Sequence, residues 1–204
     1  SNSTWIVFNG EIYNYRQIRQ ELRAKGYQFR TESDTEVILQ LYADRGERCV
    51  EAMNGMFAFA IWDRNKRTLF LARDRMGVKP LYYAETPGAF VFGSEVKALF
   101  ASKLVEPSCR EEALAEYLVF RQVAGNDTLF RGVKSLPPGC TMTVRDEQLD
   151  IRRYWSLRPE QPAEPMNFAQ AVRTFRELFE DAVKLRLISD VPVGTFCSGG
   201  VDSS

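Results

Sequence analysis

Short runs of aromatic and β-branched residues recur between residues 57 and 92 and restrict the fold more than any other feature of the sequence. The runs cover residues 57–63, 68–73, 81–84 and 89–92, and their composition is typical of β-strands. Only a few turn residues separate some of these runs: 65–67 lie between the first and second runs, and 87–88 lie between the third and fourth. Loops this short join neighbouring antiparallel strands, so the sequence predicts an antiparallel meander.

Helices and further strands are predicted on both sides of this meander. Residues 5–8 form a short apolar strand, which we expect to end in a tight turn at Asn9 and Gly10. Helical spacing of apolar residues predicts a helix capped by Asn14 and a second one capped by Ser33 or Asp34. The remaining expected elements are strands at 27–31, 140–144 and 149–154 and a helix at 110–120. Together these elements indicate an α+β domain.

A change of composition at residues 156–166 marks a domain boundary. This stretch contains three prolines and no apolar period, which is typical of a linker. Beyond it, apolar residues at helical spacing fill 168–185, and a short apolar strand is expected at 191–196. We therefore expect one domain at 1–155, a linker at 156–166, and the beginning of an α/β domain at 167–204.

The charge balance excludes several classes of partner. The 204 residues include 27 basic and 27 acidic side chains, so the chain lacks the net charge that attracts nucleic acid or anionic membranes. No apolar run approaches the roughly 18 to 20 residues that cross a bilayer, and no secretion signal is recognisable. We expect a cytoplasmic protein without nucleic-acid or membrane partners, and the sequence leaves its oligomeric state open, a homodimer included.

The chain contains no histidine, and its four cysteines are widely scattered. Ser-His and Cys-His nucleophile pairs and histidine-ligated metals are therefore excluded. The cysteines form no closely spaced pair of the kind found in zinc sites, so we expect most of them to be buried apolar thiols. Any catalysis must use other groups.

Polar residues at the end of the first strand indicate a site. The Asn9 side chain and the unobstructed backbone N–H of Gly10 can donate to the oxyanion that forms when an amide is attacked. Glu11 and Asp34 can hold the ammonium group of a free amino acid. The alternative is purely structural. A strand and a turn would account for Gly10, and a helix cap for Asp34, but neither explains the polar Asn9 and Glu11 on the two sides of the glycine.

The C-terminal residues indicate an anion site. Backbone amides near Gly199 and Gly200 and the hydroxyls of Ser198 and Ser203 suit phosphate oxygens, and Asp202 suits Mg²⁺ bound to those phosphates. The segment lacks the spacing and the lysine of a Walker A loop. Its pattern resembles the pyrophosphate loop of ATP pyrophosphatases, although a Gly-Gly turn with a helix cap is an alternative.

Several motifs in the same order resemble the class II glutamine amidotransferase domain of asparagine synthetases and the start of their synthetase domain. They cover nearly the whole chain, and long motifs in a fixed order are more specific than any one of them. The motifs are NGEIYNY at 9–15, SDTEV at 33–37, NGMFAF at 54–59, RDRMGVKPLYY at 73–83, FGSEVKAL at 92–99, LPPG at 136–139, RYW at 153–155 and SGGVDSS at 198–204.

The resemblance implies an N-terminal-nucleophile hydrolase fold, in which helix layers enclose two antiparallel sheets, followed by the start of an α/β ATP-pyrophosphatase domain. It implies that Asn9 and Gly10 form the oxyanion hole, and that Glu11 and Asp34 help to hold the amino group of glutamine. In the family a cysteine at the mature N-terminus attacks glutamine, and its own amino group is the base, so no histidine is needed. The parent enzyme would use glutamine, aspartate, ATP and Mg²⁺.

This chain departs from the family pattern at both ends. It begins with Ser1, Asn2 and Ser3 instead of a cysteine and ends within the pyrophosphate loop. We therefore expect the polypeptide itself to hydrolyse no glutamine, to make no asparagine and to bind no cofactor. Two alternatives are a relative that amidates another carboxylate and a folding or interaction module without chemistry. In the second alternative, Arg73 to Lys79 would form an exposed charged loop; for an enzyme we expect buried ion pairs there.

Overall fold

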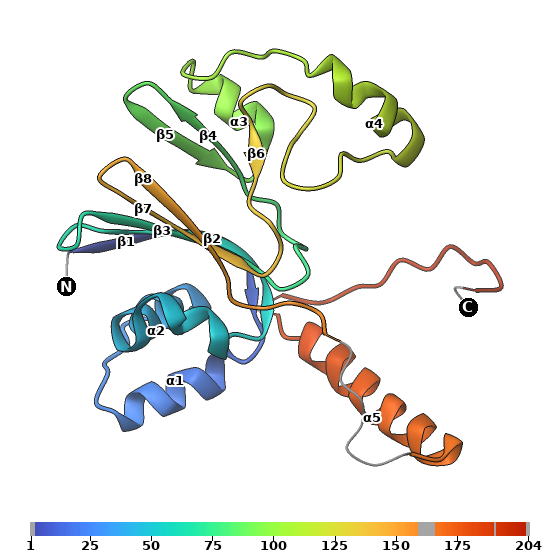
Figure 1. Cartoon of the computed structure of the whole chain (residues 1–204). Coiled ribbons are helices and arrows are strands. Elements are labelled where there is room, and N and C mark those ends of the chain that lie inside the picture. Colours follow the sequence, from blue (N-terminus) through green and yellow to red (C-terminus); the bar gives the residue numbers. More distant parts are fainter. Residues whose placement is uncertain (1–2, 159–165, 190, 203–204) are drawn as a thin grey trace. The chain divides into compact units, whose positions relative to one another are not determined.

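A computed structural model describes residues 3–158, 166–189 and 191–202. The chain divides into two compact units, residues 1–157 and 158–204 (Figure 1). The predicted linker at 156–166 lies largely outside the described residues, and the predicted domain bounds stay predictions. No helix within the described ranges has the length and apolar content to cross a membrane.

Five antiparallel strands form the first sheet of the larger unit. In spatial order they are β1 (Thr4–Ile12), β2 (Gly55–Asp63), β3 (Thr68–Arg73), β7 (Cys140–Arg145) and β8 (Gln148–Arg153). β1 lies at one edge, and its register against β2 is continuous from Thr4 opposite Asp63 to Ile12 opposite Gly55. The predicted turn at Asn9 and Gly10 is therefore wrong, because both residues continue the strand.

A second sheet contains β5 (Ala89–Gly93), β4 (Tyr82–Thr86) and the short β6 (Lys134–Ser135). The two expected hairpins are confirmed, since β2 pairs with β3 and β4 pairs with β5. The four strands do not form one meander, however. β3 pairs with β7 instead of β4, because residues 74–81 carry the chain from one sheet to the other.

The two sheets pack face to face over an apolar layer, and helices cover their outer faces (Figure 1). Ala58, Leu71 and Met142 of the first sheet pack in one cluster with Tyr83 of β4 and with Leu81, which precedes β4. The alternate residues of β2 and β3 pack on the helix side, where Phe70 stacks on Tyr42 at 5.5 Å between ring centroids. The α+β prediction of a sandwich between helix layers is thus confirmed.

The helices that cover the first sheet are α1 (Tyr15–Ala24), α2 (Asp34–Arg45) and the 3-10 segment η1 (Gly46–Ala52). Residues 27–31 between α1 and α2 are not the expected strand. The backbone amides of Arg30 and Thr31 donate to the Glu36 carboxylate, so this segment bonds to the helix start and not to a sheet.

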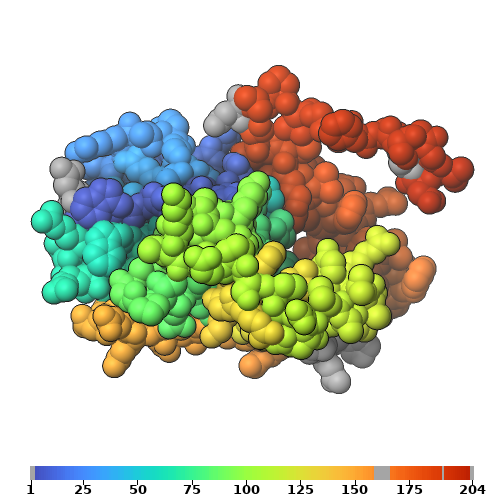
Figure 2. Space-filling view, turned by 90° about the horizontal axis from the view of Figure 1, so that it is seen from above, coloured from blue at the N-terminus to red at the C-terminus, as the bar shows by residue number. Residues whose placement is uncertain are grey.

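The second sheet is covered by α3 (Val96–Ala101), with η2 (Glu111–Ala113) and α4 (Leu114–Phe120) following in the chain. These segments and the loops between them form the surface on this side, coloured light green to yellow in Figure 2. The expected helix at 110–120 begins as a 3-10 turn and continues as α4. Of its predicted apolar face only Ala113 is buried, whereas Leu114, Tyr117 and Leu118 are exposed.

The smaller unit consists of α5 (Phe168–Arg186) and an irregular segment. Asn167 and Gln170 form a reciprocal capping box at the start of α5, which confirms a helix in this region. The expected buried strand at 191–196 is wrong, because the described residues form no strand here and Val191, Val193 and Phe196 are exposed. A strand of this kind needs partners in a sheet, and the described part of this unit supplies none.

Candidate functional site

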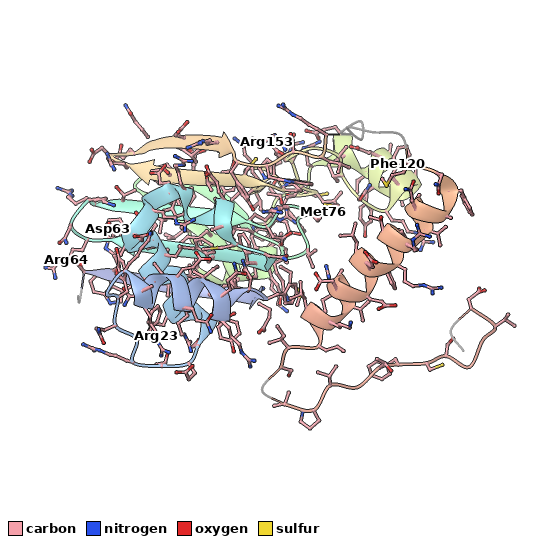
Figure 3. All side chains as sticks on the ribbon, turned by 90° about the horizontal axis from the view of Figure 1, so that it is seen from below. Arg23, Asp63, Arg64, Met76, Phe120 and Arg153 are labelled. Atoms are coloured by element: carbon pink, nitrogen blue, oxygen red, sulfur yellow. The ribbon has the colours of Figure 1, made fainter. Side chains whose placement is uncertain are left out.

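The candidate site lies at the C-terminal end of β1. This is the end of the first sheet that holds Met76, opposite the end marked by Asp63 and Arg64 (Figure 3). Asn9 and Glu11 stand opposite Ala58 and Met56 in the ladder, so their side chains share the sheet face on which Ala58 meets the second sheet. The two polar residues that the sequence singled out therefore lie on one face.

Asn9 bridges the two sheets. Its side-chain nitrogen Nδ2 donates to the hydroxyl of Ser94, which follows β5, at 3.1 Å. Both residues line a pocket of about 400 Å³ between the sheets. Its other lining residues are Val7, Phe8, Ala58, Phe59, Ala60, Leu81, Phe92 and Gly93. A polar amide and a hydroxyl at the wall of a mostly apolar pocket form an arrangement that can orient a ligand.

Gly10 is required by close strand packing and not by a turn. Its φ is +149°, and a Cβ atom there would lie 2.1 Å from the Met56 carbonyl oxygen and 2.7 Å from Phe57 Cα. The N–H of Tyr13 donates toward the β2 side, to the Asn54 carbonyl, whereas that of Ile12 donates to Asp34 on the other side. The N–H groups of an antiparallel strand point alternately to its two sides. The N–H of Gly10 therefore points in the same direction as that of Ile12, away from β2.

Asp34 joins the start of α2 to the end of β1. Its Oδ2 accepts from the backbone N–H of Ile12 at 3.1 Å, across 22 residues of sequence. The helix cap itself is Ser33, whose hydroxyl accepts from the N–H of Thr35 at 3.1 Å. Capping therefore does not explain Asp34, because its carboxylate accepts from the backbone of β1 at Ile12, the residue after Glu11.

Arg19 holds the segment that carries Asp34, a role that the sequence analysis did not predict. Its side chain is only 4% exposed, forms an ion pair with Glu32 and donates to the Ser33 carbonyl at 3.2 Å. The guanidinium also lies over the rings of Tyr15 and Phe29. Its position next to Ile18 in the apolar stripe of α1 was the one available signal.

The loop after β3 supports the same end of the sheet. Asp74 is 1% exposed, and its two oxygens accept from the backbone amides of Phe57, Met76, Val78 and Lys79 at 3.0 to 3.1 Å. The expected ion pairs are absent among the described residues of this loop. Backbone amides satisfy the Asp74 carboxylate instead. The alternative of an exposed charged loop holds for Arg75 but not for the buried Asp74.

Arg73 completes this support. Its guanidinium donates to the carbonyls of Gly77, Lys79 and Leu136 at 2.7 to 2.9 Å and to the Ser135 hydroxyl at 3.0 Å. Burial lowers the pKa of Arg73, and the adjacent carboxylate of Asp74 opposes that shift. These bonds fix the chain where it crosses from the first sheet to the second.

The sequence-predicted residues of the first unit are thus brought to one end of β1 but not into one cavity. Asn9 lines the pocket between the sheets, whereas Glu11 and Asp34 are not among its lining residues. Glu11 lies further along β1, and Asp34 lies at the start of α2. The N–H of Gly10 points to the outer side of the strand. The catalytic and binding roles of the four residues stay predictions.

The predicted phosphate loop in the second unit is exposed over Ser198, Gly199, Gly200 and Asp202, and Ser203 lies outside the described residues. Its donors have the right chemistry for phosphate, and the Gly200 amide lies 3.5 Å from the Ser198 hydroxyl. The described residues nevertheless form no cradle around an anion, and no cluster of three or more metal-binding side chains occurs among them. The binding of ATP and Mg²⁺ by this segment stays a prediction.

Two of the four cysteines, Cys49 and Cys140, are buried, whereas Cys109 and Cys197 are exposed. The expectation that most would be buried is therefore wrong. Burial raises the pKa of Cys49 to about 12, so this thiol is unsuited to act as a nucleophile at neutral pH.

Known proteins with similar sequences extend over almost the whole chain. Asparagine synthetase [glutamine-hydrolyzing] 3 of Bacillus subtilis is 44% identical over 200 residues, which is 98% of this chain and 32% of that protein. Asparagine synthetase [glutamine-hydrolyzing] 1 of the same organism is 42% identical over 203 residues, or 98% of this chain and 31% of that protein. The chain thus spans about a third of the length of these relatives.

The fold agrees with solved amidotransferases. The glutamine phosphoribosylpyrophosphate amidotransferase of B. subtilis, in complex with ADP and GMP, superposes with a TM-score of 0.56 and 23% identity, over 76% of this chain and 30% of that one. At this identity the likeness shows the fold alone, and it confirms the N-terminal-nucleophile hydrolase type of sandwich.

Family models divide the chain in the same way as its motifs. The model described as asparagine synthase matches residues 174–204. The model described as glutamine amidotransferase domain matches residues 1–155, which include the whole sandwich and the end of β1. The chain therefore belongs to the glutamine amidotransferase domain family.

Proposed function

We propose that this chain supplies the glutamine site of a glutamine-hydrolysing asparagine synthetase. The observation that carries the proposal is the contact of Asp34 with the backbone N–H of Ile12, which puts a carboxylate at the end of β1, one residue after Glu11. Carboxylates of this kind suit the α-ammonium group of a free amino acid. The names of the relatives and the two family matches support the same function.

In this proposal Asn9 and Gly10 stabilise the oxyanion that forms when a nucleophile attacks the side-chain amide of glutamine. The N–H of Gly10 points away from β2, and the Asn9 amide lies one residue before it. Donors that are already oriented stabilise the developing charge without reorganisation during the reaction. Glu11 and Asp34 orient the substrate by its amino group.

For the second unit we propose the start of a synthetase domain that uses ATP and Mg²⁺ to activate aspartate for attack by the released ammonia. Ser198, Gly199, Gly200, Asp202 and Ser203 would face the phosphates, with Asp202 toward the metal. The chemistry of these side chains and the family match at 174–204 support this assignment. Because the segment forms no cradle in the observed conformation, no reaction step is assigned to it.

A glutaminase assay of the full-length protein that carries this segment tests the proposal. We expect ammonia release from glutamine, and a loss of about 10²-fold in kcat with little change in KM for Asn9→Ala, because one oxyanion donor is removed. Asp150→Asn, an exposed carboxylate on β8, is the matched control and should leave both constants unchanged. The proposal would be contradicted if the full-length protein released no ammonia from glutamine, or if Asn9→Ala were as active as the unsubstituted protein.

The acid acceptor is tested separately by asking which carboxylic acid stimulates exchange between ATP and pyrophosphate. We expect aspartate to do so. Stimulation by a different acid would support the alternative of a related amidotransferase. If no acid stimulates exchange and no glutamine is hydrolysed, the alternative of a module without chemistry is favoured.

A further inference from the structure

A hydrogen bond to Ser94 joins the Asn9 side chain to the end of the second sheet, where Ser94 follows β5. The two residues are 85 positions apart, and Asn9 Nδ2 lies 3.1 Å from the Ser94 hydroxyl oxygen. Both are half-buried at the wall of the pocket between the sheets. A partly buried amide that has one fixed partner is held in a defined plane.

The backbone at Ser94 is fixed from both sides. Gly93 pairs with Tyr82 of β4, and a Cβ atom on Gly93 would approach Leu99 Cδ1 of α3 to 3.3 Å. After Ser94, the Glu95 carbonyl accepts from the N–H of Ala98 at 3.0 Å and so begins α3. Because Leu99 is fully buried, the strand end and the helix start are held together, and the hydroxyl has a rigid support.

The geometry of the Asn9 carboxamide explains why such a support matters. The terminal torsion of asparagine has a broad energy profile, so an isolated side chain samples many orientations of its amide. One of the two N–H bonds of Asn9 is donated to Ser94, which leaves the second N–H in the plane set by that bond. An oxyanion donor is most effective when its direction is fixed before the charge develops.

We propose that Ser94 is a positioning residue, which orients the side-chain amide of Asn9 toward the oxyanion of the glutamine reaction. This inference rests on the proposed function, since it assigns Ser94 a role in that same site. Ser94 itself does not touch the reacting atoms. It acts through Asn9, and it thereby makes the oxyanion hole depend on the second sheet.

Steady-state kinetics of the full-length protein carrying this segment test the role. In Ser94→Ala we expect kcat for glutamine hydrolysis to fall about tenfold with KM within about twofold, which is less than the loss on removing the donor itself. Ser94→Thr keeps the hydroxyl and should restore kcat. Thr86→Val removes a hydroxyl from the opposite end of β4, where it donates to the Ala89 carbonyl, and should have no effect.

The double variant Asn9→Ala, Ser94→Ala gives a readout that a merely structural role would not produce. If Ser94 acts through Asn9, the double variant should be no slower than Asn9→Ala alone. Unchanged kcat in Ser94→Ala, or losses that multiply in the double variant, would overturn the role of Ser94. Lack of glutamine hydrolysis by the unsubstituted protein would instead overturn the proposed function.

The contact can also be observed without catalysis, in the present chain. The side-chain NH₂ resonances of Asn9 in a nitrogen-15 NMR spectrum should shift in Ser94→Ala while the backbone amides of β1 keep their positions. Ser94→Thr should retain the original shifts. Side-chain resonances that are identical in the unsubstituted chain and Ser94→Ala would contradict the hydrogen bond on which the inference depends.

Discussion

Replacing Asp74 by asparagine tests how the end of the first sheet is held together. The carboxylate accepts four backbone N–H groups, with Met76 and Val78 on Oδ1 and Phe57 and Lys79 on Oδ2. An asparagine keeps one acceptor oxygen but presents an NH₂ group to the other two donors. Since each buried donor left without a partner costs about 1 to 3 kcal/mol, Asp74→Asn should lower the free energy of unfolding by about 2 to 6 kcal/mol.

That loss is a large part of the roughly 5 to 15 kcal/mol that stabilises a typical domain. Urea unfolding followed by tryptophan fluorescence measures it, and Asp150→Asn on the exposed strand β8 is the matched control, with an expected change below about 0.5 kcal/mol. If Asp74→Asn lost less than about 1 kcal/mol, the carboxylate would not be the acceptor that organises this loop.

Three further perturbations probe other contacts. Gly10→Ala should disrupt the pairing of β1 with β2, because its Cβ would lie 2.1 Å from the Met56 carbonyl oxygen; normal urea stability of this variant would refute the close approach. Cys49 should resist a thiol reagent at pH 8 while Cys109 reacts, because a pKa raised to about 12 keeps the buried Cys49 protonated; equal labelling rates would contradict its burial. Arg19→Met should cost about 1 to 3 kcal/mol in urea unfolding, because it removes the bonds of a buried guanidinium to Glu32 and to the Ser33 carbonyl before α2; an unchanged midpoint would count against that anchor.

Local sequence patterns predicted the elements whose stability depends on neighbours in the chain. The hairpins β2–β3 and β4–β5 have short connections, and α5 carries its own capping box, so composition and spacing were sufficient. The sheet in which each hairpin lies depends on the loop after Arg73, whose bonds reach residues more than 60 positions away. No local pattern contains that information.

In the candidate site, too, residue types could be predicted from the sequence, whereas contacts between distant residues could not. The residue types at Asn9, Gly10 and Asp34 marked it in the sequence, but the turn expected at Asn9 and Gly10 is an edge strand with close backbone packing. Ser94 lies within the FGSEVKAL motif, but no local pattern predicts its role, because its contact with Asn9 spans 85 residues. The strand expected at 191–196 failed because an apolar run becomes a strand only where a sheet can pair with it.

The most direct test of the glutamine site is the KM for glutamine of Asp34→Asn in the full-length protein that carries this segment. Asparagine keeps an oxygen that can accept from the Ile12 amide but removes the charge that we propose to face the substrate ammonium. A charge-assisted hydrogen bond worth about 1.5 to 3 kcal/mol predicts a rise in KM of about tenfold to a hundredfold, with kcat little changed. A KM equal to that of the unsubstituted protein would contradict the assignment of this end of β1 as the glutamine site.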